Sequence, residues 1–183
     1  MPEGTFSKQG DAIFKRTDGS LVNLADTLQK MKDGNNGAPG WAYDATPNSS
    51  VRTITVPAGK LWQILHIHGE IVCTATVGSR VLFVQILNGS AQVVWAAQKS
   101  AVIAASQKGV VNLSPSLPAG TTAANAPMLD GTSPNIAVYN PIPSFMLPAG
   151  YQIKIWDSAS IDAAADDMIT SVHYIEYNAE DFQ

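Results

Sequence analysis

One tripeptide, Pro-Ala-Gly, occurs three times in this chain, each time directly after an apolar residue. The copies are Val56-Pro57-Ala58-Gly59, Leu117-Pro118-Ala119-Gly120 and Leu147-Pro148-Ala149-Gly150. Proline is favoured at the second position of a type I turn and glycine at the fourth, so each copy predicts a type I turn where a strand reverses. Strand-like runs follow the first copy at 61–76 and the third at 151–156. The chain is therefore predicted to be an antiparallel β protein.

Short strands follow one another quickly from Val51 onward, separated by turn residues such as glycine, serine and asparagine. The predicted strands are 52–56, 61–76, 80–87, 91–97, 101–105, 109–113, 135–139, 144–147, 151–156 and 168–177. Many short strands without an interior helix are typical of an antiparallel β-sandwich. We predict an all-β sandwich of jelly-roll type, ahead of an immunoglobulin-like one, because the Cys/Trp/Cys pattern of the latter is missing. Two long connections, 114–134 and 157–167, should lie at the ends of the sandwich.

The first fifty residues differ in character from the rest. Leucine, alanine and methionine side chains at 21, 24, 25, 28 and 31 follow helical spacing, which predicts a short amphipathic helix within an N-terminal arm. A helix of that length is marginal alone, so its apolar stripe must dock on something. We predict two parts: an arm at 1–50, with Phe6, Phe14, Trp41 and Tyr43 as apolar anchors, and a jelly-roll domain at 51–183.

Charged residues make up only 14% of the chain, with 15 acidic and 11 basic side chains and a net charge of -4. Soluble domains usually contain about 25%. No cluster of Lys and Arg is present, which argues against nucleic-acid binding. No apolar run approaches membrane-spanning length, and no secretion signal is recognisable. We expect a soluble protein made in a cytoplasm, without a membrane partner, whose low charge favours contact with copies of itself.

His66, His68 and Glu70 are the sharpest chemical candidates. They alternate along one predicted strand, so their side chains fall on one face about 6.6 Å apart, which is within the reach of a shared metal ion. Outward-facing polar residues on a half-buried strand are the ordinary alternative. We expect no metal and no cofactor. Trp62 would share that face and is a candidate for contact with another subunit or a glycan.

The same stretch resembles the first motif of the cupins, which are also jelly rolls. A glycine, a His-x-His pair, a glutamate and a closing glycine occur in cupin order at Gly59, His66, His68, Glu70 and Gly78. Only one residue separates the second histidine from the glutamate, whereas cupins place three or four there. In the second motif, the position of the last histidine is occupied by isoleucine at 153. A cupin-like metal-dependent enzyme is therefore the least favoured hypothesis.

Other constellations support ordinary structural roles. Asp162, Asp166 and Asp167 are candidate calcium ligands, but their spacing matches no EF-hand. Cys73 lies in an apolar run and is expected to be a buried thiol. Trp95 and Trp156 are expected in the core. No nucleophile elbow or phosphate-binding loop is recognisable, so no catalytic residue is predicted and we do not expect an enzyme.

Two stretches carry a further resemblance. The first runs from Thr53 to Leu87 and includes the opening Thr53 to Lys60, Trp62 and the turn Thr76-Val77-Gly78-Ser79-Arg80; the second runs from Leu147 to Met168. Both are similar to jelly-roll structural proteins of tailed bacteriophages. The similarity consists of turn and strand signatures. It implies a virion structural protein, such as a capsid decoration (cement) protein or a fibre component.

This resemblance implies a homotrimer on the outer capsid surface, assembled in the bacterial host cytoplasm, with the major capsid protein as partner. Residues expected to contact the capsid or a neighbour are Phe6, Phe14, Leu24, Leu28 and Met31. Those expected to contact another subunit are Trp62, Arg80, Asp162 and Asp166. The alternatives are a fibre or receptor-binding head that binds carbohydrate through Trp41 and Tyr43, and the cupin-like enzyme using His66 and His68.

Overall fold

The computed structural model describes residues 13–15, 21–23, 37–98, 102–115, 120–122, 134–157 and 159–182. The chain divides into two compact units, Met1–Ala38 and Pro39–Gln183. In the first unit, β1 (Ile13–Lys15) pairs antiparallel with β2 (Leu21–Asn23). The predicted helix therefore does not begin at Leu21, which lies in a strand, and its positions 24–31 fall outside the described residues. No helix in the described part of the chain is long and apolar enough to cross a membrane.

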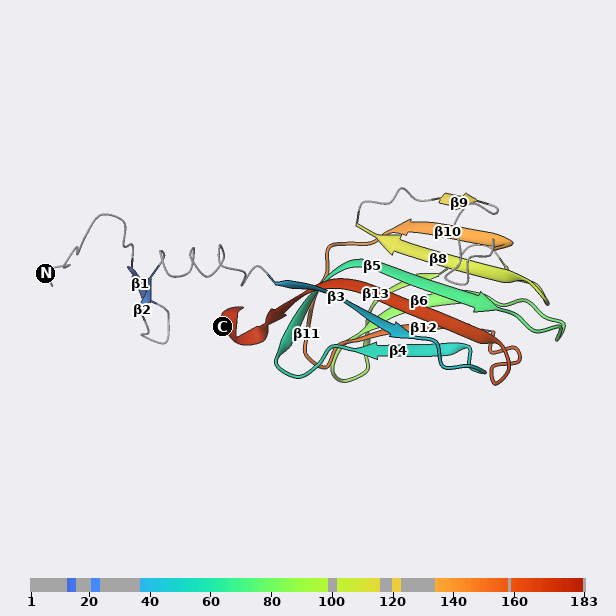
Figure 1. The fold of residues 1–183 in the computed structure, drawn as a ribbon, viewed down its shortest axis with the longest axis horizontal. Helices are drawn as coiled ribbons and strands as arrows, with labels where there is room; N and C mark the ends of the chain where they lie inside the picture. The colour runs from blue at the N-terminus through green and yellow to red at the C-terminus, as the bar shows by residue number, and fades with distance from the viewer. Residues whose placement is uncertain are drawn as a thin grey trace, which may run out of the picture. The chain divides into compact units, whose positions relative to one another are not determined.

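Eight strands of the second unit form a sandwich of two sheets (Figure 1). They are β3 (Ala38–Asp44), β4 (Val51–Thr55), β5 (Lys60–Val72), β6 (Leu82–Leu87), β7 (Val93–Gln98), β8 (Lys108–Ser114), β12 (Gln152–Asp157) and β13 (Asp167–Asn178). One sheet has the order β3-β13-β5-β8 and the other β4-β12-β6-β7. The first strand thus pairs with the eighth, the second with the seventh, the third with the sixth and the fourth with the fifth. This nested pairing is the jelly roll, so the predicted fold class is confirmed.

Three further strands lie in the connection between β8 and β12. β10 (Ile136–Pro141) runs parallel beside β8, and β9 (Gly120–Thr122) pairs antiparallel with β10. β11 (Met146–Pro148) pairs with the first part of β5. A 3-10 helix, η1 (Ala179–Phe182), follows β13. These strands widen the first sheet at one side and leave the nested pairing unchanged.

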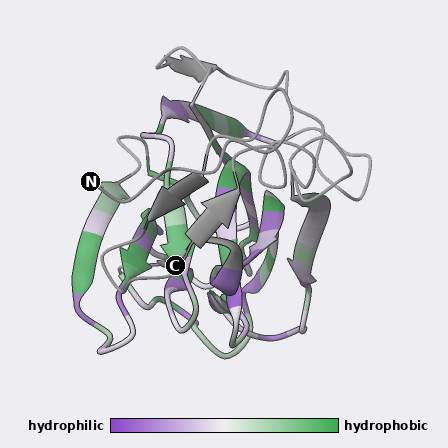
Figure 2. Ribbon diagram, turned by 90° about the vertical axis from the view of Figure 1, so that its left-hand side faces the viewer, coloured by the Kyte–Doolittle hydropathy of each residue, from purple (hydrophilic) through white to green (hydrophobic). Residues whose placement is uncertain are grey.

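Apolar residues at alternate strand positions form the core between the two sheets. Figure 2 shows hydrophobic segments, in green, along the strands. On β12, Ile153 and Ile155 are fully buried, whereas Lys154 between them faces outward. The sheets approach closely at Gly69, where an added Cβ would lie 3.1 Å from side-chain atoms of Ile155 and Val111. Glycine at this position therefore permits the close packing of β5 against β12. Cys73 is buried, as expected.

A β-bulge changes the phase of β5 in the middle of the strand. The pairing of β5 with β13 shifts between His173 and Tyr174, which leaves Leu65 as the extra residue on β5. Before the bulge, Trp62 and Ile64 face the core; after it, His66 faces outward. The expectation that Trp62 shares a face with the histidines was therefore wrong. Its indole stacks on Tyr174 with ring centroids 3.7 Å apart and is 3% exposed.

The two described Pro-Ala-Gly turns reverse the chain as predicted, but with a different geometry. Lys60 N–H donates to the carbonyl of Pro57, and Tyr151 N–H to that of Pro148, so proline holds the first position and glycine the third. Gly59 has a φ of 74°, the left-handed value that the third position of a type II turn requires. The predicted type I turn, with proline second and glycine fourth, was therefore wrong: both residues lie one position earlier in the turn. In the remaining copy, at 117–120, only Gly120 lies among the described residues.

The sandwich begins earlier than predicted, because β3 precedes Val51 and Trp41 and Tyr43 belong to this strand. The predicted strand at 101–105 is replaced, within 102–105, by an isolated bridge between Ile103 and Arg80. Trp95 packs against the core as expected. Trp156 does not, since it alternates with the buried Ile155 and lies beside Phe83 on the outer face of its sheet.

Candidate functional site

The densest polar network of the described residues lies at one end of the sandwich. The jelly-roll topology brings four loops together there: 45–50, 73–81, 102–107 and 159–166, which we call the loop end. Backbone hydrogen bonds join them in pairs. Ser50 N–H donates to Ala163 O at 3.0 Å, Ser106 N–H to Thr74 O at 2.7 Å, and Arg80 and Ile103 exchange two bonds. The four loops therefore hold one another in place.

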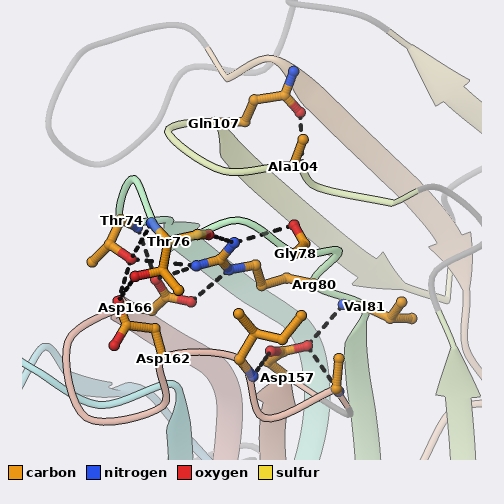
Figure 3. A network of polar contacts seen from close by, with 12 residues as sticks. Thr74, Thr76, Gly78, Arg80, Val81, Ala104, Gln107, Asp157, Asp162 and Asp166 are labelled. Carbon is orange, nitrogen blue, oxygen red and sulfur yellow. Dashed lines mark hydrogen bonds and ion pairs between the residues drawn. The ribbon is translucent and has the colours of Figure 1, made fainter.

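Arg80 occupies the centre of this network (Figure 3). Its Nε and Nη2 donate to the two carboxylate oxygens of Asp166 at 2.8 and 3.1 Å, in a two-pronged ion pair. Its Nη1 donates to the carbonyls of Thr76 at 2.7 Å and Gly78 at 3.2 Å. Hydrogen bonding to Asp166 raises the pKa of Arg80, although burial opposes the shift. Arg80 and Asp166 are both 0% exposed, so the ion pair is fully buried. Its two parallel hydrogen bonds are the favourable geometry for an arginine and a carboxylate.

Two further aspartates tie the loops to the same network. Asp157 is buried at the end of β12 and accepts backbone N–H groups from Val81 at 2.8 Å and from Ala159 and Ile161 at 3.1 Å. Asp162 accepts the hydroxyl of Thr76 at 2.7 Å and also that of Thr74. These two hydroxyl donors lower the pKa of Asp162.

These placements correct part of the predicted subunit contacts. Arg80 does meet the acidic loop, but the loop belongs to its own chain, and the closed ion pair has no exposed surface to offer a neighbour. Asp166 and Trp62 were also predicted to contact another subunit, but both are buried within their own chain. Asp162 is half-exposed, and its proposed contact stays a prediction. The oxygens of Asp166 are occupied by Arg80 and by Thr74 N–H, so this carboxylate is poorly suited as a calcium ligand.

The three histidines of the chain gather on the outer face of the larger sheet. The ring of His66 lies 6.2 Å from that of His68 and 5.8 Å from that of His173, between centroids. His68 uses both ring nitrogens: Nδ1 is 2.7 Å from Asn112 Oδ1, and Nε2 is 2.7 Å from Glu70 Oε1. Burial lowers the pKa of His66, and the neighbouring His68 and His173 lower it further.

This arrangement gives the His66, His68 and Glu70 motif a structural explanation. The alternation prediction is correct in that the three residues share a face, but Glu70 and His68 are buried there and bonded to each other. Since both nitrogens of His68 already have partners, neither is left to bind a metal. No group of three or more His, Cys, Asp or Glu side chains in the described ranges is placed to hold a metal ion.

Two aromatic residues extend the histidine face toward the sheet edge. Trp41 and Tyr43 on β3 are 64% and 53% exposed, and their rings stack with centroids 6.4 Å apart. Trp41 also contacts His173, edge to face, at 5.8 Å. The sequence analysis assigned these aromatics to an arm, because Pro39 and Gly40 are uncommon inside strands and hide the strand pattern of β3.

The predicted capsid contacts lie in the first unit. Phe6, Leu24, Leu28 and Met31 fall outside the described residues. Phe14 lies on β1, where its backbone is opposite Val22. All five contacts stay predictions.

Residues of the network that sequence reasoning missed are Thr74, Thr76 and Asp157. Thr74 and Thr76 were assigned to a long strand, because threonine is common in strands. The available signal was the concentration of Thr, Gly and Ser just before a solitary arginine. These residue types supply the hydroxyls and carbonyls that a buried guanidinium needs.

Comparison with known proteins adds little. No protein-family model and no curated protein matches the sequence. Among solved structures, the chain is similar to one of the Gx strain of infectious bursal disease virus, with 12% identity and a TM-score of 0.34 over 74% of this chain. It is also similar to T=1 particles derived from infectious bursal virus, with 10% identity and a TM-score of 0.27 over 75% of this chain. The matches cover 32% and 38% of those chains, so this chain spans about a third of their length. The jelly-roll assignment therefore depends on the strand pairing of the chain itself.

Proposed function

We propose that this chain is a non-enzymatic structural protein of a virus particle. In its specific form, it is a capsid decoration protein that binds the outer surface of a bacteriophage head as a homotrimer and stabilises the shell. The observation that carries the proposal is that several buried polar side chains of the described residues bond to one another or to the backbone of the fold. Arg80, Asp157, Asp166 and His68 are buried and bonded within the fold, where they fix its shape.

Two further features support the proposal. The jelly roll is a fold that viral capsid domains use, although lectins and cupins use it too. The turn and strand signatures at 53–87 and 147–168 resemble phage structural proteins of this fold. In this proposal the protein acts through contact area. A standard interface buries about 1,600 Å² in total, and several contacts made at once by a symmetric oligomer add through multivalency.

Binding to empty capsids tests this function. Purified protein is mixed with particles assembled from the major capsid protein alone, and bound protein is measured by co-sedimentation together with the melting temperature of the particles. We expect saturable binding and a higher melting temperature. Particles that already carry the protein are the matched control and should take up no more. A chain that neither binds nor stabilises the empty particles contradicts the proposal.

A second candidate function is favoured by Trp41 and Tyr43. Two exposed, stacked aromatic rings on a sheet edge form a platform on which a sugar ring can pack, with the imidazole of His173 beside it. A fibre or receptor-binding head would use such a platform for carbohydrate. Glycan-array binding that is lost in the Trp41→Ala variant, but kept in Trp156→Ala on the opposite sheet, would select this function. Absence of any glycan binding would remove it.

A further inference from the structure

We propose that the loop end is the surface through which two or more copies of this chain associate, with Val77 as its central apolar contact. The inference deepens the proposed function, since it rests on the chain acting as an oligomer and assigns the surface that holds the oligomer together. The loop at 73–81 is held in one shape by bonds from Arg80. The ion pair between Arg80 and Asp166 is buried together with four further bonds that end on this loop or its neighbour.

Such a network is a poor source of stability alone, because burying two charges costs about as much as their attraction returns. Its effect on shape is clearer. Arg80 binds the carbonyls of Thr76 and Gly78 on either side of Val77, so the tip of the loop has little freedom. Gly78 packs so tightly on Ile161 that an added Cβ would lie only 3.0 Å from Cγ2 and closer still to Cδ1. A loop fixed in this way loses little entropy when a partner binds it, which favours affinity.

The fixed loop presents an apolar side chain to solvent. Val77 is 91% exposed, more than any other exposed large hydrophobic residue among those described. Other exposed residues of the same end include the apolar Ala75, Val102 and Ala104. A stiff projection with an apolar tip has the form of an interface contact that inserts into a partner.

Charge identifies another copy of this chain as the partner. The chain carries a net charge of -4, and a contact through faces that lack charge avoids placing like charges of two copies against each other. Every exposed residue of the described loop end is uncharged. The charged groups of these loops are the buried Arg80 and Asp166 and the half-exposed Asp162, whose carboxylate accepts two hydroxyls. Asp167, exposed at the start of β13, accepts Asn48 N–H at 2.6 Å.

Analytical ultracentrifugation of the full chain tests the inference with two matched variants. Val77→Asp places a charge at the tip of the loop end. Val94→Asp makes the same change at another exposed valine, 51% exposed, on β7. We expect the wild type and Val94→Asp to self-associate equally, and Val77→Asp to weaken association at least about tenfold. Because both sites are exposed, both variants should keep the thermal unfolding midpoint of the monomer, which is measured alongside.

The possible results separate the inference from the proposed function when capsid binding is measured on the same samples. If Val77→Asp associates like the wild type, or if the wild type is a strict monomer, the inference is overturned. It is also overturned if Val77→Asp loses capsid binding but not self-association, because the loop end would then bind a different protein. If the chain associates through Val77 but never binds capsids, the inference stands and the proposed function falls.

Discussion

The buried ion pair predicts a large loss of stability when its cation is removed. In Arg80→Met, Asp166 keeps the N–H of Thr74 at 2.8 Å but loses both bonds from the guanidinium. Breaking a buried pair in this way costs about 3–5 kcal/mol, because the remaining carboxylate is charged and buried. The carbonyls of Thr76 and Gly78 also lose their donors, which places the expected loss toward the upper part of that range.

For a chain of this length, 1 kcal/mol changes the melting temperature by about 2–4 °C, so the expected drop is about 6–20 °C. Thermal unfolding followed by circular dichroism, with urea unfolding for the free energy, measures it. The matched control is Lys154→Met, which removes a cation stacked 4.7 Å above the Trp156 ring and should cost about 0.5–1 kcal/mol. Arg80→Lys keeps the charge without the two-pronged geometry and should fall in between.

A double variant separates the cost of the unpaired charge on Asp166 from the cost of the lost hydrogen bonds. Arg80→Met combined with Asp166→Leu removes both charges, so it should unfold at a higher temperature than Arg80→Met alone even though more bonds are lost. The reasoning is refuted if Arg80→Met is as stable as Lys154→Met. It is also refuted if the double variant is no more stable than the single one, since the cost would then not arise from an unpaired buried carboxylate.

Two further predictions concern packing and pH. Gly78→Ala should destabilise the fold by about 1–3 kcal/mol, because its Cβ would overlap the side chain of Ile161. Gly89→Ala, where the added Cβ meets nothing within 4 Å, should leave the urea midpoint nearly unchanged, and equal midpoints for the two variants would contradict the packing argument. The pKa of His66 is lowered from 6.5 in the fold, so the unfolded chain binds its proton more readily and the free energy of unfolding should fall as the pH drops below about 6.5. Urea midpoints across that pH range should fall less in His66→Gln than in the wild type, and parallel curves would exclude His66 as a cause.

The strands were predictable from sequence because turn residues punctuate an alternating apolar pattern. The predicted segments from 52–56 to 168–177 overlap β4, β5, β6, β7, β8, β10, β11, β12 and β13, except at 101–105, and the segment 61–76 runs past the end of β5 at Val72. β3 was missed because Pro39 and Gly40 interrupt it. Its place in the sheet depends on pairing with β13, more than 120 positions away in the chain, which no local pattern reports.

The site was harder to predict than the fold, because its residues meet only after folding. Sequence alone suggested that Arg80 and the acidic loop belong together. It could not reveal that Arg80 pairs with Asp166 of the same chain and that both side chains are buried. The face of Trp62 was mispredicted for a related reason. A single extra residue at Leu65 reverses the alternation, and a bulge of this kind has no reliable signature in an apolar run.

The strands between β8 and β12 have a practical consequence for engineering. Because β10 is anchored along β8 and β11 along β5, the eight nested strands close without using the rest of this connection. A foreign peptide or an affinity tag inserted between β9 and β10 would therefore leave the pairing of the eight nested strands unchanged.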